Sequence, residues 1–352
     1  MKKHLISLLT ALCLVITLGA CSRPEETASS APATTVPPST TTAPPTTTTA
    51  PPALAVNLFT GESDVDDDNG TRPVALMIDN VSQARPQYGI DKADLFLEAE
   101  TEGGVTRMMV VFANAARIPE KIGPVRSARS PFVLMAQTFD AIYCHAGGST
   151  AGLATLKSTG VTDFDGLAGA NSSFWRDAYF LQNRSAEHTL ITSGAKLSSR
   201  ISSSKIRNTT QRQPFFSYGD STGSGAGQQL QVFFSGAQTI SFVYDDGLYK
   251  KSNGALGSAS PHKTVDGTQL SAANVLVLYD QKYSENEATI SFRLKSGNGL
   301  LVTGGTSRDI QWSRSTTGLS ITEKDGSPAK MAAGKTYICL VAKEYASKTV
   351  VR

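Results

Sequence analysis

Residues 130–160 read SPFVLMAQTFDAIYCHAGGSTAGLATLKSTG and predict a helix, a buried strand and a second helix in direct succession. A serine and a proline open the first segment as a helix N-cap and first turn would, and apolar side chains then recur at helical spacing up to Phe139. Residues 141–144 form a short apolar strand, and the next helix is expected to begin after Ser149 and to end before Gly160. This part of the chain is therefore predicted to be mixed α/β.

The residues on either side extend this pattern. Residues 73–78 form an apolar run that ends at Asp79, and residues 95–112 form two apolar segments around Gly103-Gly104, a pair able to supply positive φ in a hairpin turn. A third helix is expected at about 193–201.

The second half of the chain predicts mostly antiparallel β-structure, because short β-forming runs alternate with Gly, Asn and Asp. The runs are 231–234, 240–244, 248–250, 275–279, 289–293, 300–303, 309–313 and 337–342. The fold class is thus α+β, with an N-terminal mixed α/β domain at 59–205, a linker at 206–227 and a β-rich domain at 228–352.

The N-terminus indicates export and lipidation. Residues 1–20 have the charged start and the short apolar stretch of a signal peptide, and Leu-Gly-Ala precedes Cys21, the expected lipid-bearing mature N-terminus. Residues 21–58 are rich in Ser, Thr and Pro and predict a disordered tether. The acidic run at 64–68 lacks the glycine and glutamate of a calcium loop, so a solvated linker is favoured. We expect a cell-membrane protein, lipid-anchored on the extracytoplasmic face.

Composition excludes one class of partner. The net charge is only +3 and no long basic run is present, so nucleic acid is not an expected partner. Outside the signal and the lipidation position, Cys144 and Cys339 are expected to be two buried free thiols rather than one disulfide.

Several motifs together resemble the YerB family of bacterial lipoproteins. They are Arg72-Pro73 with Ile78-Asp79-Asn80, Glu102 to Arg107, Glu120 to Arg129, and Tyr143 to Ser149, and a looser likeness runs from about 228 to 345. At Glu187-His188-Thr189 the chain departs from the family's Pro-His-Asn. The resemblance implies a two-domain, membrane-anchored envelope protein and supplies no reaction.

Two arginines form the first candidate site. Arg126 and Arg129 lie three residues apart just before a predicted helix N-terminus, which suits a phosphate or carboxylate ligand. The alternative is that each guanidinium pairs with a carboxylate of the chain and fixes a loop.

The second candidate is the turn that follows the strand at 141–144. With parallel strands, His145 and the amides of Gly147, Gly148 and Ser149 would lie at a strand's carboxyl end, where α/β proteins bind ligands. A nucleophilic Ser149 activated by His145 is weakly supported, because no Gly-x-Ser-x-Gly motif is present.

The third candidate is a row of glutamates. Glu98, Glu100 and Glu102 alternate along one strand, and a two-residue turn would pair Glu100 with Arg107 across the hairpin. Such carboxylates could do acid–base work, whereas the plain alternative is a solvated face with one salt bridge. A metal site that combines Asp79 and His145 with a glutamate is a minor alternative, because no recognised ligand spacing occurs, and we expect neither metal nor cofactor.

These observations favour a lipoprotein that binds an anionic ligand of the cell wall or of a lipid-linked precursor, or a partner envelope protein, through Arg107, Arg126, Arg129 and the glycine turn. The alternative is an envelope hydrolase or transferase acting on a phosphate-bearing or glycan substrate with Asp79, Glu98, Glu102 or His145. A solute-binding protein would need two similar α/β lobes, which the β-rich second half argues against. Convergence of these residues on one cleft distinguishes binding or catalysis from a scaffold.

Overall fold

A computed structural model describes residues 56–63, 70–168, 173–210, 213–286 and 289–352. The predicted signal peptide, Cys21, most of the tether and the acidic run at 64–68 lie outside these residues. None of the helices in these residues has the length and apolar composition of a membrane-spanning segment.

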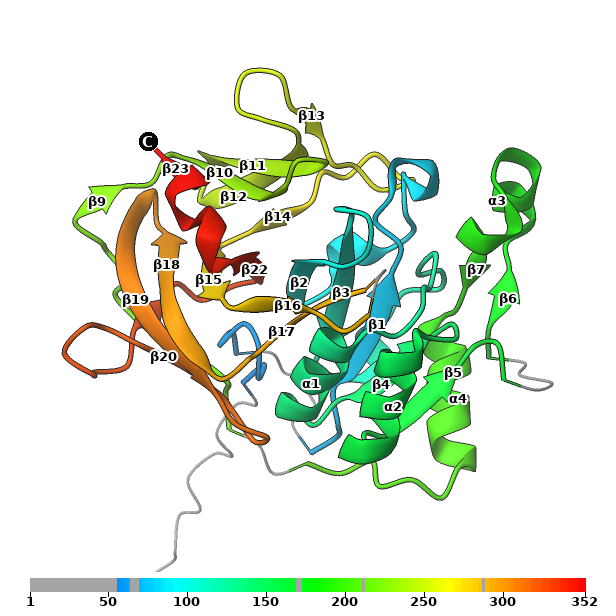
Figure 1. Ribbon diagram of the computed structural model, residues 1–352. Coiled ribbons are helices and arrows are strands. Elements are labelled where there is room, and N and C mark those ends of the chain that lie inside the picture. Colours follow the sequence, from blue (N-terminus) through cyan, green and yellow to red (C-terminus); the bar gives the residue numbers. More distant parts are fainter. Residues whose placement is uncertain (1–55, 64–69, 169–172, 211–212, 287–288) are drawn as a thin grey trace, which may run out of the picture. The chain divides into compact units, whose positions relative to one another are not determined.

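One large sheet runs through both halves of the chain (Figure 1). Its strand order is β20-β19-β18-β15-β22-β2-β3-β1-β4-β5, with β9 paired to β19. The bounds are β1 Val74–Ile78, β2 Leu95–Glu100, β3 Thr106–Phe112, β4 Ile142–His145, β5 Asp163–Asp165, β9 Gly225–Ala226, β15 Asn274–Asp280, β18 Ser296–Thr303, β19 Thr306–Arg314, β20 Leu319–Thr322 and β22 Thr336–Ala342.

The pairing of β2 with β22 joins the two halves. These strands run parallel, with Leu95 opposite Thr336 and Ala99 opposite Leu340. On its other side β22 pairs in parallel with β15. The sheet is therefore continuous across the predicted linker at 206–227, and that stretch itself contributes β9 and the short strand β8, Ser217–Tyr218.

A second sheet, with the order β13-β12-β11-β10-β23 and β14 paired to β12, comes from the C-terminal half. The bounds are β10 Gln229–Ser235, β11 Gln238–Asp245, β12 Leu248–Asn253, β13 Ser260–Pro261, β14 Ser271–Ala272 and β23 Val350–Val351. Three two-stranded pairs complete the strands: β16 Lys282–Ser284 with β17 Ile290–Phe292, β21 Lys330–Met331 with β8, and β6 Trp175–Arg176 with β7 Leu190–Ile191.

Helices belong mainly to the N-terminal half. They are α1 Ser130–Thr138, α2 Thr150–Thr159, α3 Ala178–Asn183 and α4 Gly194–Ser203, and the 3-10 turns are η1 Ser82–Ala84, η2 Ile90–Lys92, η3 Ala115–Arg117, η4 Ala186–His188 and η5 Lys343–Lys348. The predicted helices at 131–139, 150–159 and 193–201 are confirmed within two residues, although the N-cap of the first is Arg129 and not Ser130, and all eight predicted C-terminal strands are present.

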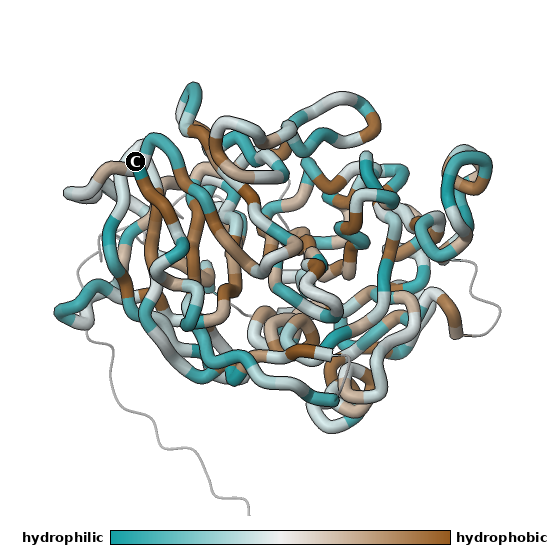
Figure 2. The backbone as a smooth tube through the Cα atoms, turned by 45° about the horizontal axis from the view of Figure 1, so that its top comes forward, coloured by the Kyte–Doolittle hydropathy of each residue, from teal (hydrophilic) through white to brown (hydrophobic). Residues whose placement is uncertain are grey.

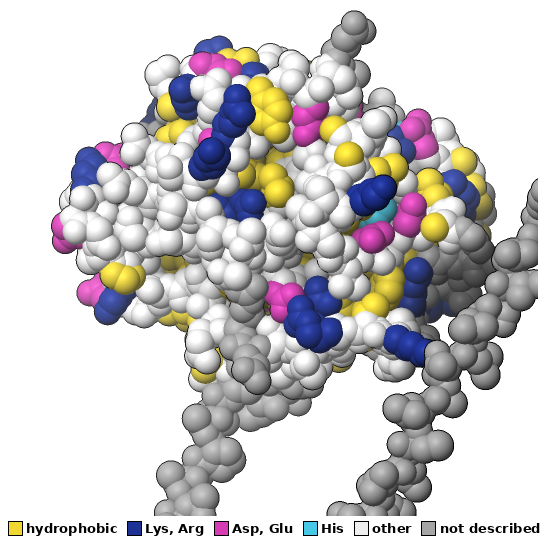
Figure 3. All heavy atoms as spheres, turned by 60° about the horizontal axis from the view of Figure 1, so that its bottom comes forward, with side chains coloured by type: hydrophobic (Ala, Val, Ile, Leu, Met, Phe, Trp, Pro, Cys, Tyr) yellow, Lys and Arg dark blue, Asp and Glu magenta, His cyan; other side chains and the backbone are white. Residues whose placement is uncertain are grey.

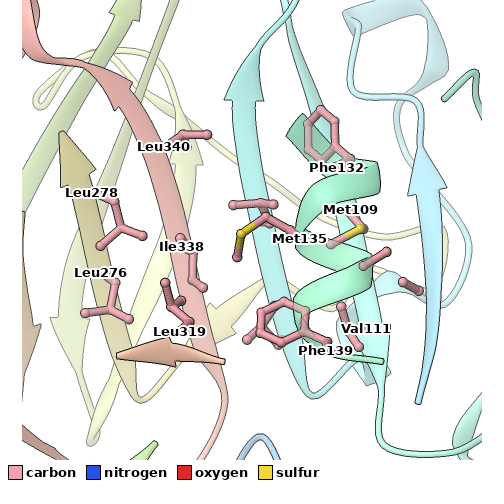
Figure 4. Close-up of a cluster of buried hydrophobic side chains, with 14 of the residues drawn as sticks. Met109, Val111, Phe132, Met135, Phe139, Leu276, Leu278, Leu319, Ile338 and Leu340 are labelled. Carbon is pink, nitrogen blue, oxygen red and sulfur yellow. The ribbon is translucent and has the colours of Figure 1, made fainter. Parts of the chain in front are cut away.

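The large sheet has a hydrophobic core on each face. On one face, Phe132 and Met135 of α1 and Phe139 at its C-cap pack against Met109 and Ile338 of the sheet (Figure 4). On the other face, the second sheet and α4 cover a second apolar cluster. Figure 2 shows the hydrophobic segments concentrated along these strands. The predicted α+β class, with a mixed N-terminal part and a mostly antiparallel C-terminal part, is confirmed.

The hairpin at 95–112 forms with a different register from the one predicted. Thr101 N donates to Val105 O at 2.9 Å, which leaves a three-residue loop, and Glu100 pairs with Thr106 while Arg107 lies opposite Ala99. The extra loop residue moves Arg107 to the opposite face of the sheet from Glu100. The predicted Glu100–Arg107 ion pair is therefore wrong.

Candidate functional site

The carboxyl ends of β1, β2 and β4 lie at one edge of the large sheet, because β1 and β4 are parallel and β3 is antiparallel to both β1 and β2. Residues 122–128 cross this edge. Arg126 N donates to Met77 O and Ala146 N donates to Arg126 O, both at 2.9 Å. The arginine segment and the glycine turn are thus neighbours, although they are separate in the sequence.

The first network at this edge joins Asp79, Arg126, His188 and Glu187. Asp79 is buried after β1, and its Oδ2 lies 2.7 Å from His188 Nδ1 and 3.1 Å from Arg126 Nε. Arg126 Nη2 lies 2.7 Å from Oε2 of Glu187, whose side chain is 56% exposed. The hydrogen bond from Arg126 lowers the pKa of Glu187. Arg126 therefore bridges a buried carboxylate and an exposed one.

The second network joins Glu102 to two arginines. Arg129 grips the Glu102 carboxylate bidentately, with Nε 2.9 Å from Oε2 and Nη2 2.6 Å from Oε1, and Arg107 Nη2 donates to the same Oε1. Burial alone would raise the pKa of Glu102, but the two guanidiniums outweigh it and lower that pKa. Burial, followed by the positive charge of Arg129, lowers the pKa of Arg107. One carboxylate therefore holds two buried cations together.

In the glycine turn after β4, His145 and Gly147 form their hydrogen bonds with other groups of the chain. His145 is buried, its Nδ1 lies 2.8 Å from Gly147 O, and its Nε2 lies 3.0 Å from Asp163 Oδ2. Gly147 N donates to Asp165 Oδ1 at 2.8 Å. Both ring nitrogens of His145 thus face acceptor oxygens of the chain.

Ser149 caps the following helix. Its amide donates to Ala128 O at 3.2 Å, and its Oγ accepts from Gly152 N at 3.0 Å. No hydrogen bond between Ser149 and His145 is found among the described residues, and the hydroxyl has the geometry of an N-cap.

Glu98 lies in a separate, fully buried network. Its Oε1 accepts from Thr106 Oγ1 at 2.6 Å and from Asn80 Nδ2 at 3.0 Å, and its Oε2 accepts from Tyr337. Lys251 Nζ lies 3.7 Å from the same Oε2, with both side chains 0% exposed. The alternative of a solvated face of glutamates is wrong, because Glu100 is also buried and pairs with Lys282 at 3.1 Å.

Burial also lowers the pKa values of the two basic side chains near Glu98, Lys251 and His262. It lowers the pKa of Lys251 to about 8. His262, whose Nδ1 lies 2.9 Å from Lys251 Nζ, has its pKa lowered by burial and then by the charge of that lysine. This network connects the ends of β1 and β2 with β12 and β22 of the C-terminal half.

The candidate residues therefore share one sheet edge but divide among four networks. The sequence did not predict their partners Glu187, Asp163, Lys251 and Tyr337, because these residues lie far from the candidates along the chain. The departure from the family pattern at residues 187–189 was the one sequence feature that pointed to any of these partners. Among the described residues, no group of three His, Cys, Asp or Glu side chains could hold a metal ion. Cys144 and Cys339 are both buried and free, as predicted.

Figure 3 shows basic and acidic side chains interspersed on the face that it draws. They do not gather there into a patch of one sign. This distribution agrees with the small net charge of the chain.

Comparisons with known proteins agree with this architecture. The family DUF3048 is described as a protein of unknown function. The model of its N-terminal domain matches residues 59–207, and the model of its C-terminal domain matches residues 230–338. The chain is 28% identical over 276 residues to "Putative lipoprotein YerB" of Bacillus subtilis strain 168, a match that covers 77% of this chain and 81% of that protein. The crystal structure of YerB from Bacillus subtilis has the same fold, with a TM-score of 0.73 at 24% identity over 85% of this chain and 99% of that one. The resemblance to YerB is thereby confirmed, and the chain belongs to the DUF3048 family.

Proposed function

We propose that this chain is a lipid-anchored extracytoplasmic protein that binds an anionic ligand of the cell envelope at Arg126. The observation that carries the proposal is the clustering of guanidiniums at the sheet edge, where the positive charges of Arg129 and Arg126 both act on buried Arg107. Parallel strand ends are a common place for ligands in α/β structures.

The carboxylate most open to exchange is Glu187. Glu102 is clamped by two arginines and Asp79 is buried, whereas the Glu187 side chain is largely exposed and lies on the short turn η4. In the proposed complex, a phosphate or carboxylate replaces Glu187 on Arg126 and is gripped by the guanidinium fork. In the protein without ligand, the Glu187 carboxylate occupies the position on Arg126 that the anion takes in the complex.

The location rests on the sequence and on the relative. Residues 1–21 carry the pattern of a lipoprotein signal, and YerB bears the name of a lipoprotein. Anchoring would hold the described part of the chain close to ligands at the membrane surface.

The test is calorimetric titration of the full-length protein with inorganic phosphate and with purified cell-wall fragments. We expect saturable binding that Arg126→Gln abolishes. Glu187→Gln should tighten binding about fivefold, which corresponds to the loss of a competing surface ion pair of about 1 kcal/mol. Arg207→Gln is the control, because Arg207 is an exposed arginine that, like Arg126, pairs with a carboxylate, that of Asp140.

Two outcomes would contradict the proposal. One is the absence of saturable binding to both probes, and the other is equal binding by the folded Arg126→Gln protein. Loss of binding in the Arg207→Gln control would also count against a specific site.

The alternative of a hydrolase or transferase receives less support from the geometry. Glu98 is 0% exposed, and both ring nitrogens of His145 are engaged by Gly147 and Asp163. The candidate acids and bases belong to different networks, whereas acid–base catalysis needs them around one substrate.

A further inference from the structure

His188 lies close to both carboxylates of the Arg126 network. Its Nδ1 lies 2.7 Å from Oδ2 of Asp79, and its Nε2 lies 3.7 Å from Oε1 of Glu187. The side chain is only 9% exposed. The imidazole ring therefore spans the space between a buried carboxylate and an exposed one.

The two oxygens of the Glu187 carboxylate face two different basic side chains. Oε2 accepts from Arg126 Nη2 at 2.7 Å, whereas Oε1 faces His188 Nε2. In the complex proposed above, an anion replaces Glu187 on Arg126. A second oxygen of that anion then lies beside His188, so the site has two basic side chains that can bind one anion.

Asp79 determines which nitrogen of the neutral His188 ring carries the hydrogen. Asp79 Oδ2 lies 3.1 Å from Arg126 Nε and 2.7 Å from His188 Nδ1. An ionised carboxylate only accepts hydrogen bonds, so the hydrogen of the neutral ring is on Nδ1. Nε2 then presents a lone pair toward Glu187, and it becomes a donor to an anion only when the ring is protonated.

Charged side chains from several elements lie near His188 or its partner Asp79. They are Asp79 after β1, Glu187 on η4, Arg126 in residues 122–128, Arg85 after η1, Arg176 on β6 and Arg184 after α3. The two carboxylates favour the protonated ring, and the arginines oppose it. A doubly charged anion brings one negative charge more than the Glu187 carboxylate that it replaces, and this additional charge favours protonation of His188.

We propose that the site at Arg126 selects a doubly charged oxyanion, such as a terminal phosphate, with one oxygen on Arg126 and another on protonated His188. This inference rests on the proposed function, to which it adds the class of ligand and a second binding residue. Binding of the anion is then accompanied by uptake of a proton at His188, so the affinity for the anion rises as the pH falls.

The test compares sulfate with methanesulfonate by calorimetric titration of the full-length protein. Between about pH 5.5 and about pH 8, the range in which a histidine changes its charge, sulfate keeps two negative charges and methanesulfonate keeps one. We expect sulfate to bind about tenfold more tightly at the lower pH than at the higher one, and methanesulfonate to bind at least about tenfold more weakly than sulfate at the lower pH. Glu187 does not cause this pH dependence, because the hydrogen bond from Arg126 lowers its pKa.

The variant His188→Asn tests the second binding residue. The asparagine amide can donate to Asp79 as Nδ1 does, but it has no group at the position of Nε2. We expect this variant to bind sulfate about tenfold more weakly at about pH 5.5 and to lose the pH dependence. A loss of affinity that is equal at both pH values, with the pH dependence retained, would show that His188 only supports the fold.

Titrations in two buffers of different ionisation enthalpy measure the protons that are taken up with sulfate. We expect net proton uptake in the parent protein and none in His188→Asn. His145→Gln is the control, because His145 is another buried histidine that contacts an aspartate, Asp163, outside the Arg126 network. The folded control should take up protons as the parent does.

Three results would contradict the inference. They are equal sulfate affinity at both pH values without proton uptake, binding of methanesulfonate as tight as that of sulfate, and proton uptake that persists in His188→Asn but disappears in His145→Gln. In the first case, loss of sulfate binding in Arg126→Gln would leave the proposed function standing. Absence of sulfate binding to the parent protein at both pH values would count against the inference and the proposed function together.

Discussion

Lys251 is a buried lysine at the boundary between the two halves of the chain. Its Nζ lies 2.9 Å from Asn253 Oδ1, 2.9 Å from His262 Nδ1 and 3.7 Å from Glu98 Oε2. A buried pair of this kind adds little net stability compared with apolar residues, but removal of one partner leaves the other charge uncompensated. The network therefore makes correct packing of the two halves depend on a few polar contacts.

The depressed pKa of Lys251 predicts an unusual pH dependence. The ordinary lysine value is 10.5 and the folded value is about 8, so above about pH 8 the unfolded chain binds more protons than the folded one. The free energy of unfolding should therefore rise with pH in this window. Burial raises the pKa of the Cys339 thiol above its ordinary value of 9.0, which opposes the rise above pH 9. Urea denaturation between about pH 8 and 9 measures the effect.

The variant Lys251→Met should remove this rise and cost about 3 kcal/mol, because it leaves Glu98 buried without its cation. Lys250→Met is the control, since Lys250 is the neighbouring lysine on β12 and is only half-buried. A pH dependence that persists in Lys251→Met would show that another group causes it.

Cys21 gives a prediction about location. Cys21→Ser removes the expected lipid attachment, and about 0.8 kcal/mol per buried methylene of the acyl chains is then lost. We expect the protein to move from the membrane fraction to the soluble fraction after cell fractionation, while Cys13→Ser, within the signal, leaves it in the membrane. Retention of the Cys21→Ser protein in the membrane would contradict lipid anchoring.

At the scale of single elements, Ser149 is a candidate nucleophile in the sequence but has a structural role as the N-cap of α2. Ser149→Ala removes the N-cap acceptor of Gly152 N and should cost about 1 kcal/mol of unfolding free energy. Phosphate binding should be unchanged. Ser158→Ala, at an exposed position of the same helix, is the control and should cost little. Loss of phosphate binding in Ser149→Ala would instead support a ligand-binding role.

Elements were predictable wherever local chemistry decides them. The helix α2 begins after Ser149 and ends before Gly160, as expected. An N-cap hydroxyl and a left-handed glycine each fix a helix end through contacts within one turn. The register of the β2–β3 hairpin was not predictable, because it depends on one extra loop residue that Gly103-Gly104 does not specify. The partners of Arg126 and His145 were missed for a related reason, since Glu187 and Asp163 come from other elements.

At the scale of the molecule, the sequence predicted the composition of each half but not their shared sheet. Apolar alternation in 337–342 identifies a strand, yet nothing in it indicates that β2 is its neighbour. Pairing between distant segments is set by the packing of both faces of the sheet, which local patterns do not contain.

The shared sheet predicts that the halves unfold together. Trp175 lies in the N-terminal half and Trp312 in the C-terminal half, and the chain has no other tryptophan. Fluorescence of Trp175→Phe and Trp312→Phe therefore reports on one half each. Within each variant, we expect the denaturation midpoint from fluorescence to equal that from circular dichroism. Fluorescence and circular dichroism transitions that do not coincide would show that the halves unfold independently.

The parallel neighbours β2 and β22 come from near opposite ends of the described chain. A ribosome or a secretion channel releases a chain from its N-terminus, so β2 emerges long before the strand that covers its edge. Contacts between such distant segments form slowly and cannot form on a partial chain. In the export that we propose for this chain, the sheet would close only after nearly the whole polypeptide has crossed the membrane in an unfolded, translocation-competent state.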